Sequence, residues 1–238
     1  MSESPTSSTP RREFLARVAS TAAVMVASTA AATPLAAATM KRAEPDSSLD
    51  GTLPFDDSWT ERVRAAKHRV VFDSAAVGDG LALEHASVFM SGYREMFATA
   101  DAETVPVVVL RHQGTVIALN DDLWKEYELG KIAEYKDPAT SAPATRNIFF
   151  RVAADDKHSP IEPESSLSAL SARGAVLLAC NRALMHLATM AATKRKQDVE
   201  EVKATFRAAV LPGVILQPSG IYAVTRAQEV GCGFVKST

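Results

Sequence analysis

The sequence predicts an α/β protein with three layers, in which helices cover both faces of a mainly parallel sheet. Four short runs of apolar, often β-branched residues have the length of buried strands, and a stretch with apolar residues at helical spacing follows each run. Strands that alternate with helices favour parallel pairing, because the chain must cross over a face of the sheet between them. With 238 residues, of which 47% are hydrophobic and 23% charged, one principal domain is expected.

Residues 1–38 predict an export signal. Arg11 and Arg12 precede an Ala-rich, weakly apolar run from Val18 to about Ala32, and small residues follow at Ala36–Ala38. This order is typical of a cleavable signal, and the paired arginines resemble a twin-arginine motif. A membrane anchor, or a disordered tail with a chance arginine pair, is the alternative, but a stable span needs a more strongly apolar run. We expect a periplasmic protein with no membrane span after cleavage.

The first half of the remaining chain contains two βα units. Residues 39–66 predict an exposed linker ending in a short helix, and residues 67–238 form the domain proper. A turn at Gly78–Gly80 separates the first strand from its helix. Residues 116–119 are compatible with a short strand or with the approach to a helix. The predicted elements are a helix at 58–66, a strand at 68–73, a helix at 81–98, a strand at 105–110 and a helix at 121–129 capped by Asn120 or Asp121.

An irregular segment at about 130–164 interrupts the pattern. It carries four prolines and many small polar residues, and its one apolar run, Asn147–Arg151, predicts a short strand. A loop of this length in a compact domain is usually functional, oligomeric or mobile, so we interpret it as an insertion.

Regular alternation returns after the insertion. The predicted elements are a helical turn at 166–172, a strand at 175–180, a helix at 182–192, helical spacing at 198–209, a strand at 214–217 and a helix at 221–230. Cys232 then opens a final strand.

Four motifs in this last third carry a family resemblance: Gly174–Asn181, Leu211–Val214, Pro218–Ile221 and Arg226–Phe234. Their order and spacing resemble the DsrE/DsrF-like (YchN-like) family over residues 67–238. The resemblance implies a compact α/β/α domain that associates as trimers or hexamers. It also implies relatives in which a strand-end cysteine carries sulfur as a persulfide. The export signal and the insertion depart from those sulfur carriers.

Candidate site residues follow from the position of ligands at the carboxyl ends of parallel strands. The residues that follow the four strands are Asp73, His112, Cys180 with Asn181, and Ser219 with Gly220. We interpret Cys180 and His112 as catalytic and the others as ligand-binding.

Each candidate also has a simpler explanation. Cys180 precedes a helix N-terminus, which favours a reactive thiolate, but it could equally be a small apolar residue packed under the helix. His112 could activate the thiol, bind an anion or serve only as a turn residue. Asp73 could orient His112 or cap the Gly78–Gly80 turn. Ser219 could bind an oxyanion or cap the last helix.

Several other classes of function lack support in the sequence. No Cys-x-x-Cys or His-x-x-x-His spacing indicates a metal, no dinucleotide fingerprint indicates a cofactor, and a formal net charge of −2 gives no sign of nucleic-acid binding. Cys180 and Cys232 are not expected to form a disulfide, because a parallel strand of about five residues separates its ends by roughly 16 Å.

The leading hypothesis is an exported homo-oligomer that handles sulfur or a small thiol-reactive ligand through Cys180, with a small molecule or a sulfur carrier as partner. The alternative is a non-catalytic oligomeric module for small-anion binding or assembly.

Overall fold

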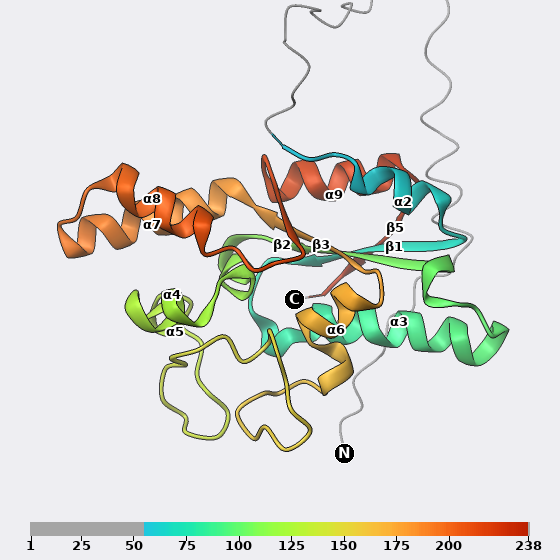
Figure 1. Cartoon of the computed structure of the whole chain (residues 1–238), viewed down its shortest axis with the longest axis horizontal. Coiled ribbons are helices and arrows are strands. Elements are labelled where there is room, and N and C mark those ends of the chain that lie inside the picture. The colour runs from blue at the N-terminus through green and yellow to red at the C-terminus, as the bar shows by residue number, and fades with distance from the viewer. Residues whose placement is uncertain (1–54, 238) are drawn as a thin grey trace, which may run out of the picture. The chain divides into compact units, whose positions relative to one another are not determined.

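The core of the molecule is one five-stranded sheet in which every paired strand is parallel (Figure 1). The computed structural model describes residues 55–237, so the predicted signal and most of the predicted linker lie outside the described residues. The strand order is β4-β3-β2-β1-β5. The strands are β1 (His68–Ser74), β2 (Thr104–Leu110), β3 (Val176–Cys180), β4 (Val214–Gln217) and β5 (Gly233–Lys236). The predicted α/β class is therefore confirmed.

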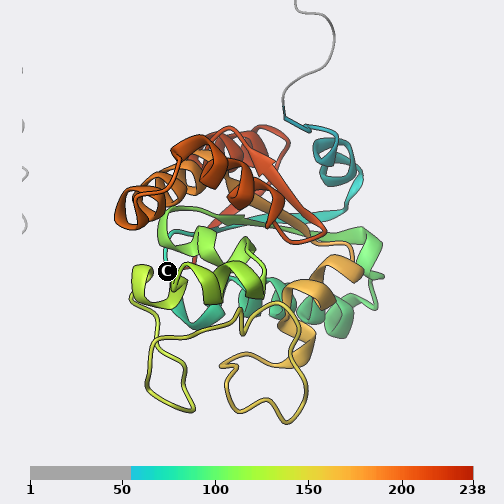
Figure 2. The same ribbon diagram turned by 60° about the vertical axis from the view of Figure 1, so that its left-hand side comes forward.

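The two faces of the sheet are buried in separate hydrophobic clusters. Because side chains alternate along a strand, Val108 faces one cluster and its neighbours Val107 and Val109 face the other. The first cluster contains side chains of α3 (Leu81–Phe97), α6 (Leu167–Ala172), α7 (Asn181–Arg195) and α8 (Val199–Ala208). The second contains side chains of α2 (Trp59–Ala65) and α9 (Gly220–Glu229). Figures 1 and 2 show α2 and α9 on one side of the sheet and α3 and α6 on the other.

The direction in which the chain travels across the sheet explains this division of helices. From β1 to β4 each new strand is added on the same side of the last, whereas β5 returns to the far side of β1. Right-handed crossovers in opposite directions place their helices on opposite faces. The helix α9, which connects β4 to β5, accordingly lies against the face that the earlier crossover helices leave open.

Polar side chains cap several of the helices where the sequence predicts helix starts. Asn120 caps α4 (Asp121–Glu126), Ser166 caps α6, Asp198 caps α8 and Ser219 caps α9, each by accepting a hydrogen bond from a backbone N–H in the first turn. The predicted helix at 121–129 is shorter than expected, because Glu128 adopts a positive φ and a separate short helix, α5 (Leu129–Ile132), follows.

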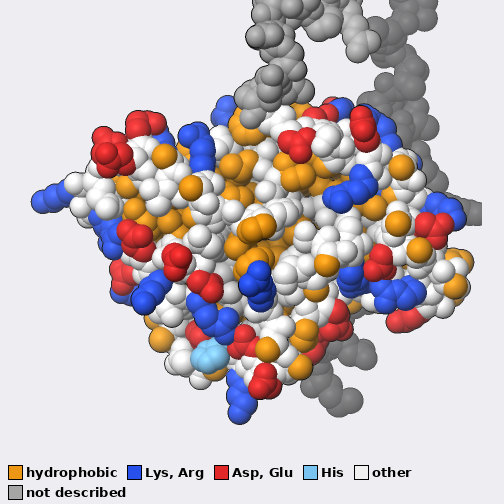
Figure 3. Space-filling view, in the orientation of Figure 1, with side chains coloured by type: hydrophobic (Ala, Val, Ile, Leu, Met, Phe, Trp, Pro, Cys, Tyr) orange, Lys and Arg blue, Asp and Glu red, His pale blue; other side chains and the backbone are white. Residues whose placement is uncertain are grey.

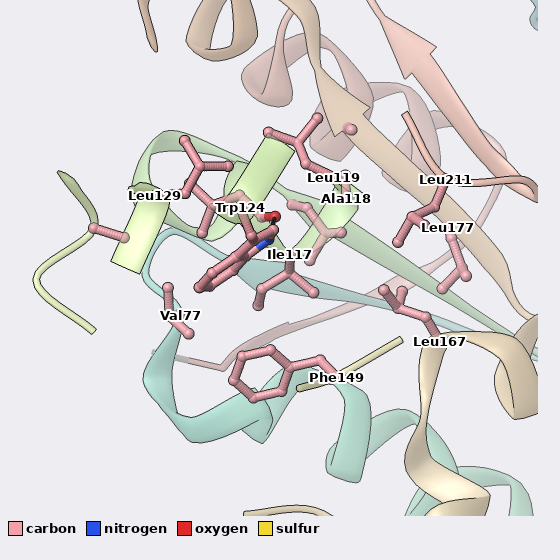
Figure 4. Close-up of a cluster of buried hydrophobic side chains, with 14 of the residues drawn as sticks. Val77, Ile117, Ala118, Leu119, Trp124, Leu129, Phe149, Leu167, Leu177 and Leu211 are labelled. Carbon is pink, nitrogen blue, oxygen red and sulfur yellow. Dashed lines mark hydrogen bonds between the residues drawn. The ribbon is translucent and has the colours of Figure 1, made fainter. Parts of the chain in front are cut away.

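The predicted strand at Asn147–Arg151 is wrong, because this run forms a buried turn without a sheet partner. The Asn147 amide donates hydrogen bonds to the carbonyls of Ile117 and Leu119, at 2.7 and 2.8 Å, and Ile148 and Phe149 are fully buried. The apolar pattern reflects packing against the domain rather than pairing with the sheet. Figure 4 shows Phe149 near Ile117, Trp124 and Val77 in the shared cluster.

Residues 112–118 form a 3-10 helix, so the segment at 116–119 is not a strand of the sheet. Leu119 makes an isolated antiparallel bridge with Val210, and the Trp124 indole donates a hydrogen bond to the Val116 carbonyl. The segment from Gly114 to Leu119 is buried and belongs to the core. The insertion contacts it through the hydrogen bonds that Asn147 donates to Ile117 and Leu119. Across residues 55–237, no helix has the length and apolar character needed to cross a membrane.

Candidate functional site

A pocket of about 480 Å³ opens at the carboxyl edge of the sheet. The register places the ends of the strands side by side there, since Leu110 pairs with Ala179 and Cys180 pairs with Gln217. The residues after β2, the end of β3 and the residues after β4 therefore meet. The lining consists of Arg111, His112, Gln113, Ile132, Cys180, Arg182, Ala183, His186, Leu187, Met190, Ser219, Gly220 and Ile221.

Four of the six sequence-predicted site residues line this pocket, namely Cys180, His112, Ser219 and Gly220. Asp73 lies next to it and contacts Arg111, which does line it. Asn181 lines a different hollow, of about 460 Å³, beside Phe55 and Leu216. Successive residues of a helix point about 100° apart, so Asn181 and Arg182 face different hollows although they are adjacent in the sequence.

Cys180 ends β3 and is the N-cap residue of α7. Its Sγ accepts a hydrogen bond from the backbone N–H of Ala183 at 3.3 Å, and the side chain is 7% exposed. The first turn of α7 presents N–H groups without helical partners, and the helix dipole favours negative charge at this end. A sulfur anion at this position is therefore stabilised by the backbone itself.

Asp73 and Arg111 form a bidentate ion pair next to the pocket. Arg111 Nε and Nη2 donate to the two carboxylate oxygens at 2.6 and 2.8 Å, and the pair is largely buried. These hydrogen bonds raise the pKa of the Arg111 guanidinium, and its Coulombic interaction with Cys180 acts in the same direction. Asp73 thus holds Arg111, and neither of the two roles predicted for it, orienting His112 or capping a turn, is seen in its hydrogen bonds.

Gly220 allows Arg111 to cross the start of α9. A Cβ atom at position 220 would lie 2.4 Å from Arg111 Cβ and 2.8 Å from its Cδ, which is closer than real side chains approach. Gly220 and the cap residue Ser219 bring a second helix N-terminus to the pocket. Gly220, which the sequence predicts to bind ligand, therefore has a steric role: it leaves room for the Arg111 side chain.

His112 opens the 3-10 helix after β2 and has a φ of 48°. Its side chain is exposed and makes no hydrogen bond to another residue in the range 55–237. Both His112 and Cys180 line the pocket, but no hydrogen bond joins them within the described structure. The imidazole is placed to meet a bound ligand rather than to hold the thiol.

Sequence reasoning missed four polar pocket residues: Arg111, Gln113, Arg182 and His186. Arg182 and His186 are four residues apart on α7, and Ala183, Leu187 and Met190 continue the same face. The sequence does contain a signal for Arg182 and His186. They lie four residues apart in the predicted helix after Cys180, and residues three or four apart share a helix face. The pocket thus has polar residues at the strand ends, and along α7 an apolar wall of Ala183, Leu187 and Met190 beside Arg182 and His186.

Cys232 lies away from this site, immediately before β5. Because β5 runs parallel to β1, its start is at the opposite edge of the sheet from Cys180, and both cysteines are free thiols. Burial raises the pKa of the Cys232 thiol to about 11. Within the described part of the chain, no group of three or more His, Cys, Asp or Glu side chains is arranged to hold a metal ion.

Comparison with protein-family models, with curated proteins and with solved structures gives no match for this chain.

Proposed function

We propose that this protein binds a small anionic sulfur compound in the pocket and accepts its sulfur on Cys180, in the periplasm and after twin-arginine export. The observation that carries the proposal is the position of Cys180. It lies in a pocket at the strand ends whose charged lining residues, Arg111 and Arg182, are both cationic. This arrangement agrees with the sulfur chemistry that the DsrE-like resemblance implies.

The transfer step is a thiol–persulfide exchange. The Cys180 thiolate attacks the outer sulfur of a donor R–S–SH, the new S–S bond forms on Cys180, the donor S–S bond breaks, and R–S⁻ leaves and takes up a proton. The N–H groups of the α7 first turn and the nearby guanidinium of Arg111 stabilise the resulting Cys180–S–S⁻ anion. The Cys180 thiol first loses its proton to solvent, His112 gives a proton to the leaving R–S⁻, and the outer sulfur of the new persulfide releases its own proton to leave Cys180–S–S⁻.

The first experiment measures alkylation of Cys180 in folded Cys232→Ser protein, with the double variant Cys180→Ser/Cys232→Ser as the blank. We expect labelling at neutral pH, and a larger preference for iodoacetate over iodoacetamide than a free cysteine shows, because the pocket favours anions. In the wild type only one thiol should react, since the raised pKa of Cys232 leaves little thiolate. If Cys180 reacts only after unfolding, the thiol mechanism is wrong.

A second experiment tests the transfer itself. Incubation of the Cys232→Ser protein with glutathione persulfide should add one sulfur atom to Cys180, as measured by intact-mass spectrometry and removed by a reductant. The Cys180→Ser/Cys232→Ser protein should gain none. Alkylation of Cys180 without sulfur transfer would mean that the thiol is reactive but does not carry sulfur.

One observation favours the alternative of a non-catalytic anion-binding module. Cys180 already acts as the cap of α7, and a buried cysteine with that hydrogen bond has a structural role without any reaction. In that case Cys180→Ser, which keeps a capping oxygen, should retain anion binding while the alkylation test fails.

The proposal includes a homo-oligomer, for which the resemblance implies a trimer or hexamer. Support comes from large apolar side chains on the exposed side of α3, where Val88, Met96 and Phe97 are 67%, 75% and 66% exposed. Contiguous exposed apolar surface is typical of an interaction site. The edge strand β5 exposes Phe234 and Val235 as well.

Export is tested by cell fractionation of the full chain. We expect the wild type in the periplasm and the Arg11→Lys/Arg12→Lys variant in the cytoplasm, because the paired arginines are the sequence signal for this pathway. Periplasmic protein from both would indicate another route.

A further inference from the structure

The pocket differs chemically between its two ends. At the strand ends its lining is polar, with Arg111, Cys180 and Ser219. Further along α7 the lining is His186, Leu187 and Met190, of which the last two are apolar. Ile132 and Ile221 add apolar surface from other elements. A small inorganic anion would contact the polar end and leave the apolar wall without a function.

The length of the apolar wall is defined by α7. Pocket-lining residues run along this helix from Arg182 to Met190, and eight residues of α-helix rise by about 12 Å. Together with a volume of about 480 Å³, this leaves room for a molecule with an extended chain beyond its charged group.

Arg182 supplies a reason to place the charged group at the strand ends. It lies in the first turn of α7, where a cation opposes the helix dipole, and it makes no ion pair or hydrogen bond with another described residue. Its charge therefore does not favour the helix. An anion held between Arg182 and the helix N-terminus would compensate this unfavourable position. No carboxylate side chain of the described residues lines the pocket, so a bound anion would meet no like charge there.

Two apolar side chains that line the pocket are open to solvent. Met190 is 43% exposed and Ile221 is 61% exposed, and both line the pocket. A hydrocarbon chain lying between them would remove their surface from water. In the view of Figure 3, hydrophobic side chains likewise reach the surface in the middle of one face, among charged side chains of both signs.

We infer that the ligand of this pocket is an organic anion with an unbranched apolar chain, its charged group beside Arg182 and Cys180 and its chain along α7 toward Met190. The inference rests on the proposed function only for the sulfur chemistry at the charged end. It narrows the sulfur donor to an organic compound and sets inorganic donors such as thiosulfate aside.

The test uses straight-chain carboxylates that cannot react with a thiol: acetate, butanoate, octanoate and dodecanoate. Binding to the Cys180→Ser/Cys232→Ser protein is measured by calorimetry, so covalent chemistry does not contribute. We expect octanoate to bind at least about tenfold more tightly than butanoate, because each buried methylene adds affinity. Equal affinity for acetate and octanoate would overturn the inference.

Two variants locate the ends of the ligand. Met190→Asp should remove the gain from chain length and leave butanoate affinity nearly unchanged, whereas Arg182→Glu should weaken all the carboxylates to a similar degree. Met190→Leu and Arg207→Glu are the matched controls, since the first keeps an apolar side chain at the same position and the second changes an exposed arginine on α8 that does not line the pocket. Octanoate binding that survives both Met190→Asp and Arg182→Glu would place it elsewhere and overturn the inference.

Failure of the inference is distinguishable from failure of the proposed function. Sulfur transfer to Cys180 without any chain-length preference would contradict the inference alone. Chain-dependent binding of octanoate without sulfur transfer would contradict the proposed function and leave the inference standing.

Discussion

At the scale of single residues, the pocket depends on a charge that is fixed before any ligand arrives. Arg111 is held by two hydrogen bonds that it donates to Asp73, at an edge where the chain has just left β2. Two fixed hydrogen bonds leave the guanidinium little rotamer freedom, so little further ordering is needed when an anion binds. In the proposed function, the pair therefore serves stability and binding together.

Asp73→Asn should destabilise the protein, because it leaves a largely buried guanidinium without its counter-charge. We expect a loss of about 1–3 kcal/mol in the free energy of unfolding, measured by urea denaturation. Glu200→Gln, which breaks an ion pair whose glutamate is exposed, is the control and should change stability by less than about 1 kcal/mol. Equal effects from the two variants would contradict the role of Asp73.

Gly220→Ala should displace Arg111 and weaken anion binding at the pocket, since the added methyl group would lie 2.4 Å from Arg111 Cβ. The measurement is the affinity for octanoate in the protein without cysteines. Gly92→Ala is the control: a Cβ atom at that position on α3 would have no described neighbour within 4 Å, and the alanine should stabilise the helix by about 0.5–1 kcal/mol. Unchanged binding in Gly220→Ala would contradict the steric role of this glycine.

At the scale of elements, the strands and their following helices were predictable because local signals agree with the final packing. Turn residues follow β4, and most helices begin after a residue that caps them. Ser219 caps α9 and Asp198 caps α8 in this way. The residues that end each parallel strand also meet by topology, which is why Cys180, His112 and Ser219 were found from the sequence.

The insertion was harder to predict because its structure depends on distant contacts. Nothing local distinguishes a buried turn at Asn147 from a short strand, since the outcome depends on the carbonyls of Ile117 and Leu119, about thirty residues earlier along the chain. The role of Arg111 was missed for the same reason: its partner Asp73 lies at the end of another strand.

Asn147→Ala should therefore loosen the attachment of the insertion to the core. The change leaves two buried carbonyls and the Phe149 N–H without their side-chain partner, at an expected cost of about 2–4 kcal/mol in the free energy of unfolding. Hydrogen exchange of the insertion should accelerate as well. Thr145→Ala, at an exposed neighbouring position, should have little effect on either measurement. A small loss of stability in Asn147→Ala would mean that packing alone holds the segment.

At the scale of the whole molecule, the two surfaces with proposed functions lie on different elements. The pocket uses residues of α7, α9 and the turn after β2, whereas the exposed apolar side chains lie on α3 and on the edge strand β5. Among the described residues, none that lines the pocket belongs to α3 or β5. Self-association and ligand binding should therefore respond to different substitutions.

Val88→Glu/Phe97→Glu should convert the proposed homo-oligomer to monomers without changing ligand affinity. The two side chains are 67% and 66% exposed on α3, so the charges cost little in a monomer but would be buried without partners in an assembly. Light scattering coupled to size-exclusion chromatography measures the mass, and octanoate binding measures the pocket. Met190→Asp, an exposed methionine at the pocket, is the reciprocal control and should keep the oligomer while losing the preference for long chains. A monomeric wild type would remove the oligomer from the proposed function, and loss of octanoate binding in the α3 variant would mean that a neighbouring copy completes the pocket.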